Sequence, residues 1–484
     1  MPLILQAITD KAVNIGFSVL TFHRVKWGLV MKSAIMIAAT GSGCGKTTIT
    51  CALLAAMKKR GLDTRAFKCG PDYIDPMFHK KVIGISSKNL DLFFSDKKMV
   101  RESFYSDNDS DISIVEGVMG LYDGTDSADN AGSSYDLACK LDIPIVLVVD
   151  AHGMGRSLLA VIKGFLSMDE NRQIQGVILN RISPMYYETI KGLIEKELSI
   201  KVMGYYPKMT EGCFESRYLG LKMPDEIDCI REQIDAAAEI AADTIDLDGL
   251  LSLGYIAQEN LTDISGKNII NGQSKVKIAV ARDEAFCFFY EDNLELLKSL
   301  GAELIEFSPI KDTKLPDDID GLLLGGGYPE LYAERLSDNT AMREAVLKAV
   351  NGGLPSLAEC GGFMYLHDSI KVDDKEYPMV GAIRGTCDKK NRLVRFGYLN
   401  IEEKNASFFS ADDRKIRGHE FHYYDSSNNG SDATSVKPGG SKSWEAAHIT
   451  ENHWWGFAHL YYPSNKAFAK AFVDKCSACR LNRK

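Results

Sequence analysis

The sequence predicts an α/β protein with two domains, each built on a parallel sheet, and three observations carry the prediction. The chain has 484 residues, more than one hydrophobic core usually holds. Short runs rich in Val and Ile alternate with helix-like segments along most of it, which is the pattern of buried parallel strands covered by helices. A glycine-rich loop ending in Lys46 follows the first such run, and Cys360 follows a later run among small residues.

Composition narrows the class of protein. Apolar residues make up 45% of the chain and charged residues 25%, as in an ordinary globular protein. The formal net charge of −9 leaves no basic excess to neutralise phosphates, so we expect no nucleic-acid partner. The apolar stretch Val13–Phe22 is too short to cross a bilayer, so we expect no membrane partner either.

Eleven cysteines are scattered along the chain. Their odd number, and the presence of one inside the glycine-rich loop, favour a reducing cytoplasm over a disulfide framework. Cys476 and Cys479 form one CxxC pair near the C-terminus with no second ligand pair close to it, so we interpret the pair as incidental rather than as a zinc site. The protein is therefore expected in the cytoplasm.

The first domain is expected over residues 31–250 as a doubly wound parallel sheet. Met31 stands just before its first strand, so residues 1–30 are interpreted as an extension that precedes the natural start. The expected strands are Ala34–Ala39, Ile112–Val115, Ile143–Val149 and Gln175–Leu179, and the expected helices are Thr48–Arg60, Ser157–Leu166 and Tyr186–Glu197.

A second domain is expected over residues 276–465. It follows a linker at 251–275, where Asn, Gly, Ser and Gln increase and no clear period remains. Residues 466–484 are expected to be a C-terminal tail. The strands expected in the second domain are Lys277–Ala281, Ala302–Phe307, Gly321–Leu324, Pro355–Glu359 and Trp454–Leu460.

The loop before the first helix has the composition of a phosphate-binding loop. Thr40 replaces Gly at the first position of the Walker A pattern, but the glycines that follow still let backbone N–H groups turn toward phosphate oxygens. Lys46 would neutralise the β- and γ-phosphates of ATP, and the Thr47 hydroxyl would bind Mg²⁺. The expected nucleotide-binding residues are Gly43, Gly45, Lys46, Thr47, Thr48 and Asn180; Asn180 is included because it closes a later strand, where it is expected to touch the adenine.

Three carboxylates are candidates for the same site. Glu116 ends an apolar strand, where doubly wound sheets bind ligands, so a metal role is favoured over a capping role. Asp72 and Asp75 lie in the turn-forming segment Lys68-Cys-Gly-Pro-Asp-Tyr-Ile-Asp-Pro and would help hold Mg²⁺ or place a carboxylate substrate. By composition alone, an ordinary surface loop is the stronger interpretation of that segment. The expected magnesium ligands are Thr47, Glu116 and Asp72.

Cys360 is the candidate nucleophile of the second domain. The string Ala358-Glu-Cys-Gly-Gly362 resembles the strand-to-helix elbow G-x-[SC]-x-G, which needs small residues because the turn is tight. A thiolate there would attack the carboxamide of glutamine, and backbone N–H groups would stabilise the oxyanion. Gly326 and Gly327 after one strand, and Gly361 after the cysteine, are the candidates for the oxyanion and glutamine side of the site.

A general base is also required, and His459 is the first candidate. It ends the last apolar strand, late in the chain, where the partner of an elbow cysteine is expected; His419 and His422 are further candidates. The ordinary alternative for any single histidine is a structural role. A phosphate loop and a nucleophilic thiol in one chain indicate a ligase that uses ATP at one site and releases ammonia from glutamine at another.

The chain resembles the cobyrinic acid a,c-diamide synthases, of the cobyrinic/cobyric acid synthase group of amidotransferases, from about Met31 to residue 465. The motifs that carry the resemblance are specific only in combination. They are Lys68-Cys-Gly-Pro-Asp-Tyr-Ile-Asp-Pro, Asn89-Leu-Asp, Val115-Glu-Gly-Val-Met-Gly-Leu-Tyr-Asp-Gly, Ser216-Arg-Tyr-Leu-Gly-Leu, Val280-Ala-Arg-Asp-Glu-Ala-Phe-Cys-Phe-Phe-Tyr, Gly325-Gly-Gly-Tyr-Pro-Glu-Leu, Ala358-Glu-Cys-Gly-Gly and Gly418-His-Glu-Phe-His-Tyr.

The resemblance implies a first domain similar to dethiobiotin synthetase, which would bind ATP, Mg²⁺ and cobyrinic acid. This domain would phosphorylate the a and c carboxylates to acyl phosphates. The second domain would be a class I glutaminase, with Cys360 as nucleophile and His459 as base, and its ammonia would form the two amides of cobalamin biosynthesis. The resemblance places Lys46, Thr47 and Glu116 in the ATP·Mg²⁺ site with Asp72 near it, and leaves open whether the protein is a monomer or a homodimer.

Two positions depart from the family pattern. Tyr218 stands where the family usually has His, and Tyr461 stands two residues after the base, where the family has His and other class I glutaminases have Glu. The residue that orients His459 is therefore not identified by the sequence.

The nearest alternative function is the same amidation chemistry on nickel-sirohydrochlorin or hydrogenobyrinic acid. A partition-type ATPase is a less favoured alternative, because it would require a lysine near Gly41 and a basic face, and the chain has neither. A glutamine-sensing protein with an inactive ATP site is another alternative, and the intact Gly-Lys-Thr-Thr sequence argues against it.

Overall fold

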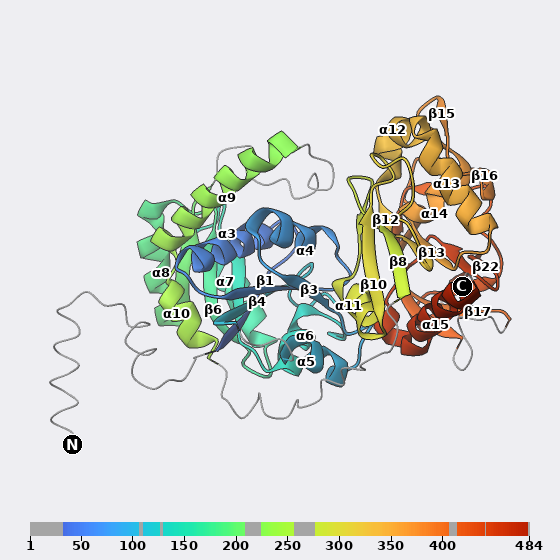
Figure 1. Cartoon of the computed structure of the whole chain (residues 1–484). Coiled ribbons are helices and arrows are strands. Elements are labelled where there is room, and N and C mark those ends of the chain that lie inside the picture. The colour runs from blue at the N-terminus through green and yellow to red at the C-terminus, as the bar shows by residue number, and fades with distance from the viewer. Residues whose placement is uncertain are drawn as a thin grey trace, which may run out of the picture.

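The computed structural model describes residues 32–105, 110–125, 129–208, 224–255, 276–405, 414–440 and 442–482. They form two α/β domains that lie side by side, the first blue to green and the second yellow to red in Figure 1. The expected extension 1–30, Met31, the segment 256–275 of the expected linker and the Ser216–Leu221 motif lie outside the described residues.

The first domain is built on a seven-stranded sheet of order β3-β2-β4-β1-β5-β6-β7. Every neighbouring pair is parallel, which confirms the predicted doubly wound sheet. The central strands are fully buried because helices cover both faces. The strands are β1 Ser33–Ala39, β2 Thr64–Cys69, β3 Ser87–Leu90, β4 Ile112–Glu116, β5 Ile145–Asp150, β6 Ile174–Asn180 and β7 Lys201–Tyr206.

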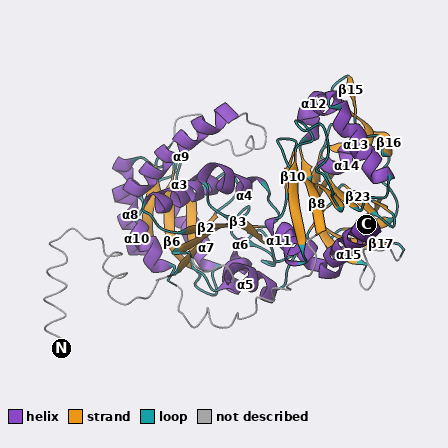
Figure 2. Cartoon of the chain, viewed as in Figure 1, coloured by secondary structure: helices purple, strands orange, loops and turns teal. Residues whose placement is uncertain are grey.

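Two hydrophobic clusters, one on each face, hold the helices against this sheet. Figure 2 shows α3 and α9 on one side of the strands and α5 and α6 on the other. Within the part of the chain that the structure describes, no helix is long and apolar enough to cross a membrane. The helices are α3 Lys46–Lys59, α4 Ile74–Phe78, a π-helical turn His79–Ile83, α5 Lys97–Tyr105, α6 Ser134–Leu141, α7 Ser157–Ser167, α8 Pro184–Leu198, α9 Pro224–Thr244 and α10 Leu247–Leu253.

The second domain has a six-stranded main sheet of order β10-β8-β11-β13-β23-β22, in which only β22 is antiparallel. Smaller sheets of order β21-β20-β17-β18-β24, β15-β14-β16-β19 and β12-β9 surround it. The main strands are β8 Val276–Ala281, β10 Ala302–Phe307, β11 Gly321–Leu324, β13 Ser356–Glu359, β22 His448–Ile449 and β23 His453–Gly456.

The other elements of this domain complete its layers. The helices are α11 Glu291–Ser299, α12 Ala333–Asp338, α13 Thr340–Asn351, α14 Gly361–Tyr365 and α15 Lys466–Asn482. The other strands are β9 Phe286–Phe288, β12 Gly326–Gly327, β14 His367–Val372, β15 Lys375–Pro378, β16 Ile383–Lys389, β17 Arg395–Glu403, β18 Lys415–His422, β19 Tyr424–Ser426, β20 Ala433–Val436, β21 Ser443–Ala446 and β24 His459–Leu460.

Three local expectations differ from the structure. The expected strand Trp454–Leu460 is two strands, because β23 pairs with β13 of the main sheet while β24 pairs with β18 of another sheet. Residues 466–482 form α15 rather than a tail, since Phe468, Phe472 and Cys476 bury one helix face in the core. Residues 251–253, expected in the linker, belong to α10.

The two domains meet through aromatic and polar contacts. The Tyr398 hydroxyl on β17 donates to Asp91 at 2.7 Å, and Phe94 stacks on Tyr461 with ring centroids 4.9 Å apart. Arg417 donates to the Phe93 carbonyl at 2.7 Å. These contacts lie where β3 of the first domain ends, so the carboxyl edge of its sheet faces the second domain.

Candidate active sites

The phosphate loop connects β1 to α3, as the sequence predicts. Gly43 and Gly45 have φ values of 78° and 92°, a backbone region that side chains disfavour. A Cβ on Gly45 would lie 2.1 Å from the Asn180 side chain, so that position also has no space for one. The Lys46 ammonium donates to the carbonyls of Gly41 and Met119 and is thereby held inside the loop.

Beside the loop, a buried chain of polar groups links strands β2 and β4 to helix α3 and the π-helical turn. The Thr47 hydroxyl at the start of α3 donates to Glu116 Oε1 at 2.6 Å, and the Lys68 ammonium at the end of β2 donates to the same oxygen at 2.9 Å. The other oxygen, Oε2, has no hydrogen bond from any described residue, and His79 Nε2 is 3.6 Å from it. A buried, unsatisfied carboxylate oxygen beside Thr47 suits a cation ligand.

Charge balance in this cluster depends on Lys68. Burial alone would raise the pKa of Glu116, but the Lys68 ammonium, with His79 and Thr47, holds it below its ordinary value. Asp75 lies 2.5 Å from the same ammonium, and burial together with the Glu116 charge raises the pKa of Asp75 to about 8. Burial opposes the Lys68 charge, yet the two carboxylates raise the pKa of Lys68 well above its ordinary value.

Two expected site residues have other contacts here. One oxygen of Asp72 accepts the backbone N–H groups of Ile74 and Asp75, which starts α4, so Asp75 rather than Asp72 is the carboxylate that touches Lys68. The Asn180 amide donates to the Cys44 carbonyl at 2.8 Å and so braces the phosphate loop from β6. Thr48 lies in the first turn of α3, next to Thr47.

In the second domain, Cys360 lies on a strained elbow between β13 and α14. Its φ of 48° and ψ of −105° fall in a region that non-glycine residues rarely adopt, as a nucleophile elbow requires. A Cβ on Gly362 would lie 2.2 Å from the Leu324 carbonyl oxygen, and one on Gly361 would lie 3.0 Å from the Gly327 nitrogen. Only glycine therefore fits beside the cysteine, and the structure brings Gly361 and Gly327 together.

Cys360 is only 7% exposed. Burial, then the charges of Glu330 and Glu420, raise the pKa of its thiol well above the ordinary value, while the Gly361 N–H acts in the opposite direction. The cysteine is therefore a neutral thiol in this state, and a base or a change of surroundings is needed to form the nucleophilic thiolate.

His459 on β24 lies close to the elbow, against β12. A Cβ on Gly326 would lie 2.2 Å from its Cε1 atom, so the imidazole rests directly on the glycine backbone. Burial, and after it the charges of the neighbouring His419 and His422, lower the pKa of His459 to about 3. Among described residues, Nδ1 of His459 has no hydrogen-bond partner and no hydrogen bond joins the ring to Cys360.

Three polar residues that could contact His459 have other partners. The Tyr461 hydroxyl donates to Asp292 at 3.1 Å, in the interface between the domains. Glu359, adjacent to the nucleophile, accepts from the Tyr462 hydroxyl at 2.7 Å, and burial raises the pKa of Glu359 to about 8. His422 lies 3.2 Å from a Glu420 oxygen, which gives it a polar partner of its own.

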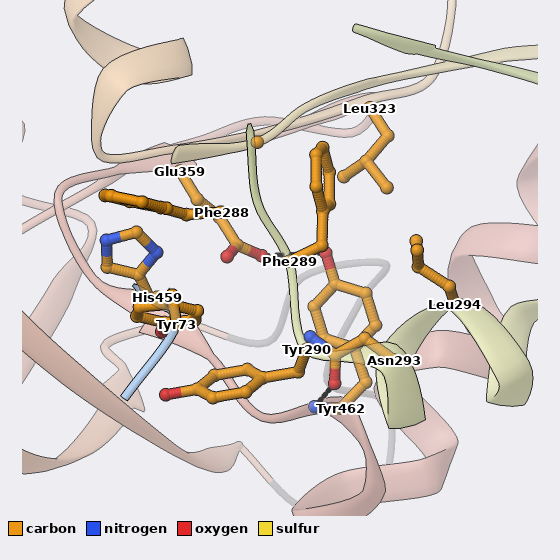
Figure 3. Close-up of a pocket in the computed structure, with 11 residues that line it drawn as sticks. Tyr73, Phe288, Phe289, Tyr290, Asn293, Leu294, Leu323, Glu359, His459 and Tyr462 are labelled. Atoms are coloured by element: carbon orange, nitrogen blue, oxygen red, sulfur yellow. Dashed lines mark hydrogen bonds between the residues drawn. The ribbon is translucent and has the colours of Figure 1, made fainter. Parts of the chain in front are cut away.

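The other face of the His459 ring contacts a residue of the first domain. Tyr73, which precedes α4, has its ring centroid 4.7 Å from that of His459 and 5.4 Å from that of Phe288. Figure 3 shows Tyr73 beside His459 at one end of a small pocket that Glu359 also lines. The volume of this pocket is about 10 Å³, room for about one water molecule.

Sequence reasoning missed Tyr73 and Lys68 as candidate site residues, and it proposed Asp75 without its contact to Lys68. All three lie in the segment Lys68–Pro76, whose mixture of charge, glycine and aromatic residues was the available signal. Lys68 contacts Glu116 at the end of β4, and Tyr73 contacts His459 of the second domain. Neither partner can be identified from the local sequence.

Comparison with known proteins supports this two-domain description. Residues 35–213 match the CobQ/CobB/MinD/ParA nucleotide binding domain family, and residues 277–461 match the CobB/CobQ-like glutamine amidotransferase domain family. The chain is also similar over nearly its whole length to proteins named cobyrinate a,c-diamide synthase.

Three of these relatives come from different organisms. The Priestia megaterium protein is 40% identical, with 93% of this chain and 98% of the relative aligned. The Caldanaerobacter subterraneus protein is 38% identical over 93% of this chain and 99% of its own length. The Picrophilus torridus protein is 39% identical over 92% and 99%. With this identity over almost the full length of both partners, the chain belongs to the cobyrinate a,c-diamide synthase family.

Proposed function

We propose that this protein uses ATP and glutamine to convert the a and c carboxylates of cobyrinic acid into amides, a step of cobalamin biosynthesis. The observation that carries the proposal is the meeting of two sites in one chain of this family: a phosphate loop with its buried Lys68–Glu116 pair, and a Cys360 elbow across the domain interface. A nucleotide site alone would not need a nucleophilic cysteine, and a glutaminase alone would not need a phosphate loop. A ligase that takes its ammonia from glutamine needs both.

The phosphate-loop domain is proposed to activate the carboxylate. A carboxylate is a poor electrophile, so transfer of the γ-phosphoryl group of ATP to it supplies a leaving group. Lys46 and Lys68 bring two ammonium groups to this edge of the sheet, where they would neutralise the charge of the transferred group. Thr47 and Glu116 would hold Mg²⁺, which when bound supplies charge neutralisation at the phosphates.

The second domain is proposed to release ammonia. Cys360 Sγ attacks the carboxamide carbon of glutamine, and His459 takes the thiol proton and gives it to the departing ammonia. The backbone N–H groups of Gly327 and Gly361 would stabilise the oxyanion. Water then hydrolyses the thioester to glutamate, while ammonia displaces phosphate from the acyl phosphate. Each amide formed therefore consumes one glutamine, one ATP and one water.

The proposal predicts two successive amidations in a single assay. Purified protein, ATP, Mg²⁺, glutamine and cobyrinic acid should give products lighter by one and then two OH-to-NH₂ exchanges, followed by mass spectrometry. Cys360→Ala should form the same products from added ammonium and none from glutamine. If the protein amidates nickel-sirohydrochlorin or hydrogenobyrinic acid but not cobyrinic acid, that compound is its substrate instead. If it amidates none of the three, the proposal is refuted.

A further inference from the structure

Tyr73 belongs to the ATP-binding domain, yet its ring is part of the surroundings of Cys360 and His459. Its centroid lies 4.7 Å from that of His459 and 4.6 Å from that of Tyr290. Burial is the main cause that raises the pKa of the Tyr73 hydroxyl, and the nearby Tyr290, Glu359 and Cys360 add to the rise. A side chain from one domain therefore forms a wall of the proposed glutaminase site in the other.

The same short segment reaches the phosphate site. Asp75, two residues after Tyr73, pairs with Lys68 at 2.5 Å, and Lys68 pairs with Glu116 at 2.9 Å. The Tyr290 hydroxyl donates to the Pro71 carbonyl at 3.5 Å, so the second domain contacts this segment on the other side of Tyr73 as well. One continuous stretch of backbone thus joins the phosphate site to the ring beside His459.

We infer that Tyr73 is a positioning residue for His459, which holds the imidazole apart from Cys360 until ATP and the carboxylate substrate bind next to Lys68 and Asp75. This inference rests on the proposed function, because it concerns when glutamine is hydrolysed. It assigns the coupling of the two sites to a single aromatic contact across the domain interface.

The geometry gives the physical reason. Among the described residues, Nδ1 of His459 has no hydrogen-bond partner and no hydrogen bond joins the ring to Cys360, while the ring contacts both Tyr73 and the Gly326 backbone. A bound triphosphate adds negative charge beside Lys68 and competes with Asp75 for its ammonium. A shift of Asp75 is transmitted to Tyr73 through a single intervening residue, which frees the imidazole to approach the thiol.

The test measures glutamate release with and without ATP, Mg²⁺ and cobyrinic acid, in the full-length protein. The wild type is expected to be stimulated about tenfold by these ligands, a typical size for coupling between two sites. Tyr73→Ala should hydrolyse glutamine at nearly the same rate in both conditions, a stimulation of about one. Tyr73→Phe keeps the stacked ring and should restore the wild-type stimulation.

A matched control changes the domain interface without touching His459. Lys80 and Glu291 form an ion pair across the interface at 3.0 Å, so Lys80→Gln removes an interdomain contact of a different kind and should keep the stimulation. The rate of alkylation of Cys360 by iodoacetamide, followed on its own peptide, gives a second readout: it should depend on ATP in the wild type and be independent of ATP in Tyr73→Ala.

The outcomes separate this inference from the proposed function. Equal stimulation of wild type and Tyr73→Ala, or an ATP-independent wild type, overturns the inference while glutamine-dependent amidation stands. Loss of stimulation in Lys80→Gln as well as in Tyr73→Ala also overturns it, because any loosened interface would then suffice. A wild type that releases no glutamate in any condition refutes the proposed function and, with it, the inference.

Discussion

His459 lies so close to the Gly326 backbone that a single added methyl group, in Gly326→Ala, should displace its imidazole. This substitution therefore tests the role of the histidine. In Gly326→Ala the new Cβ would lie 2.2 Å from Cε1 of the imidazole and 3.0 Å from Nδ1. Carbon atoms in contact normally stay about 3.5 to 4.0 Å apart. The ring must therefore move by more than about 1 Å, in a domain whose packed core limits where it can go.

The size of the effect follows from this displacement. Misplacing a catalytic group by about 1 Å costs on the order of 100-fold in rate, which corresponds to roughly 3 kcal/mol of transition-state stabilisation. We expect glutamine-dependent amidation by Gly326→Ala to fall by at least that factor. Ammonium-dependent amidation should stay within about threefold of wild type, because the first domain does not use His459.

The assay compares the two nitrogen donors at saturating ATP and cobyrinic acid, with Gly192→Ala as the matched control. Gly192 lies in α8, and a Cβ there would meet no atom within 4 Å, so that variant should be unchanged with either donor. Glutamine-dependent activity of Gly326→Ala within about threefold of wild type would contradict the assignment of His459 as the base.

Three further predictions follow from buried groups. Lys68→Met leaves two buried carboxylates without their cation, so it should lower the free energy of unfolding in urea by about 3–5 kcal/mol and abolish ammonium-dependent amidation; wild-type stability would contradict the charge balance described above. Burial lowers the pKa of His367 to about 4. The unfolded chain therefore binds a proton at this histidine near pH 6.5, whereas the folded chain binds it only near pH 4. As the pH falls from 6.5 to 4, the free energy of unfolding therefore decreases. Relative to His367→Gln, the wild type should lose about 2 kcal/mol of unfolding free energy from pH 8 to pH 5, and parallel pH curves would refute this. Tyr461→Phe should keep glutaminase activity within about threefold, because its hydroxyl contacts Asp292 rather than His459, and a loss on the order of 100-fold would make Tyr461 the orienting group instead.

The features that the sequence predicts well are those that one short segment encodes. The phosphate loop needs a strand, positive-φ glycines and a helix start, all within a few neighbouring residues, and the structure has them in that order. The Cys360 elbow is equally local, since its strain is set by the tight turn and by the glycines that follow. The parallel sheet of the first domain also follows from its Val- and Ile-rich runs.

The features that it predicts poorly depend on partners far along the chain. Trp454–Leu460 is one apolar run in the sequence, but its first part pairs with β13 of the main sheet and its last part pairs with β18 of another sheet. The position where one strand ends and the next begins is therefore set by tertiary pairing, which the local sequence does not show. The helix at 466–482 does carry a helical period in Phe468, Phe472 and Cys476, a signal that the interpretation as a tail did not use. Tyr73 stands in a Pro- and Gly-containing loop, where composition favours a surface position, and its burial comes from the second domain.

In the proposed function, nitrogen passes from glutamine at Cys360 to a carboxylate activated at the phosphate loop. The most direct measurement supplies amide-¹⁵N glutamine together with unlabelled ammonium, ATP, Mg²⁺ and cobyrinic acid, and determines the isotopic mass of the diamide. We expect the wild type to place ¹⁵N in both new amides, and Cys360→Ala to make an unlabelled diamide. An unlabelled product from the wild type, or a labelled one from Cys360→Ala, would contradict it.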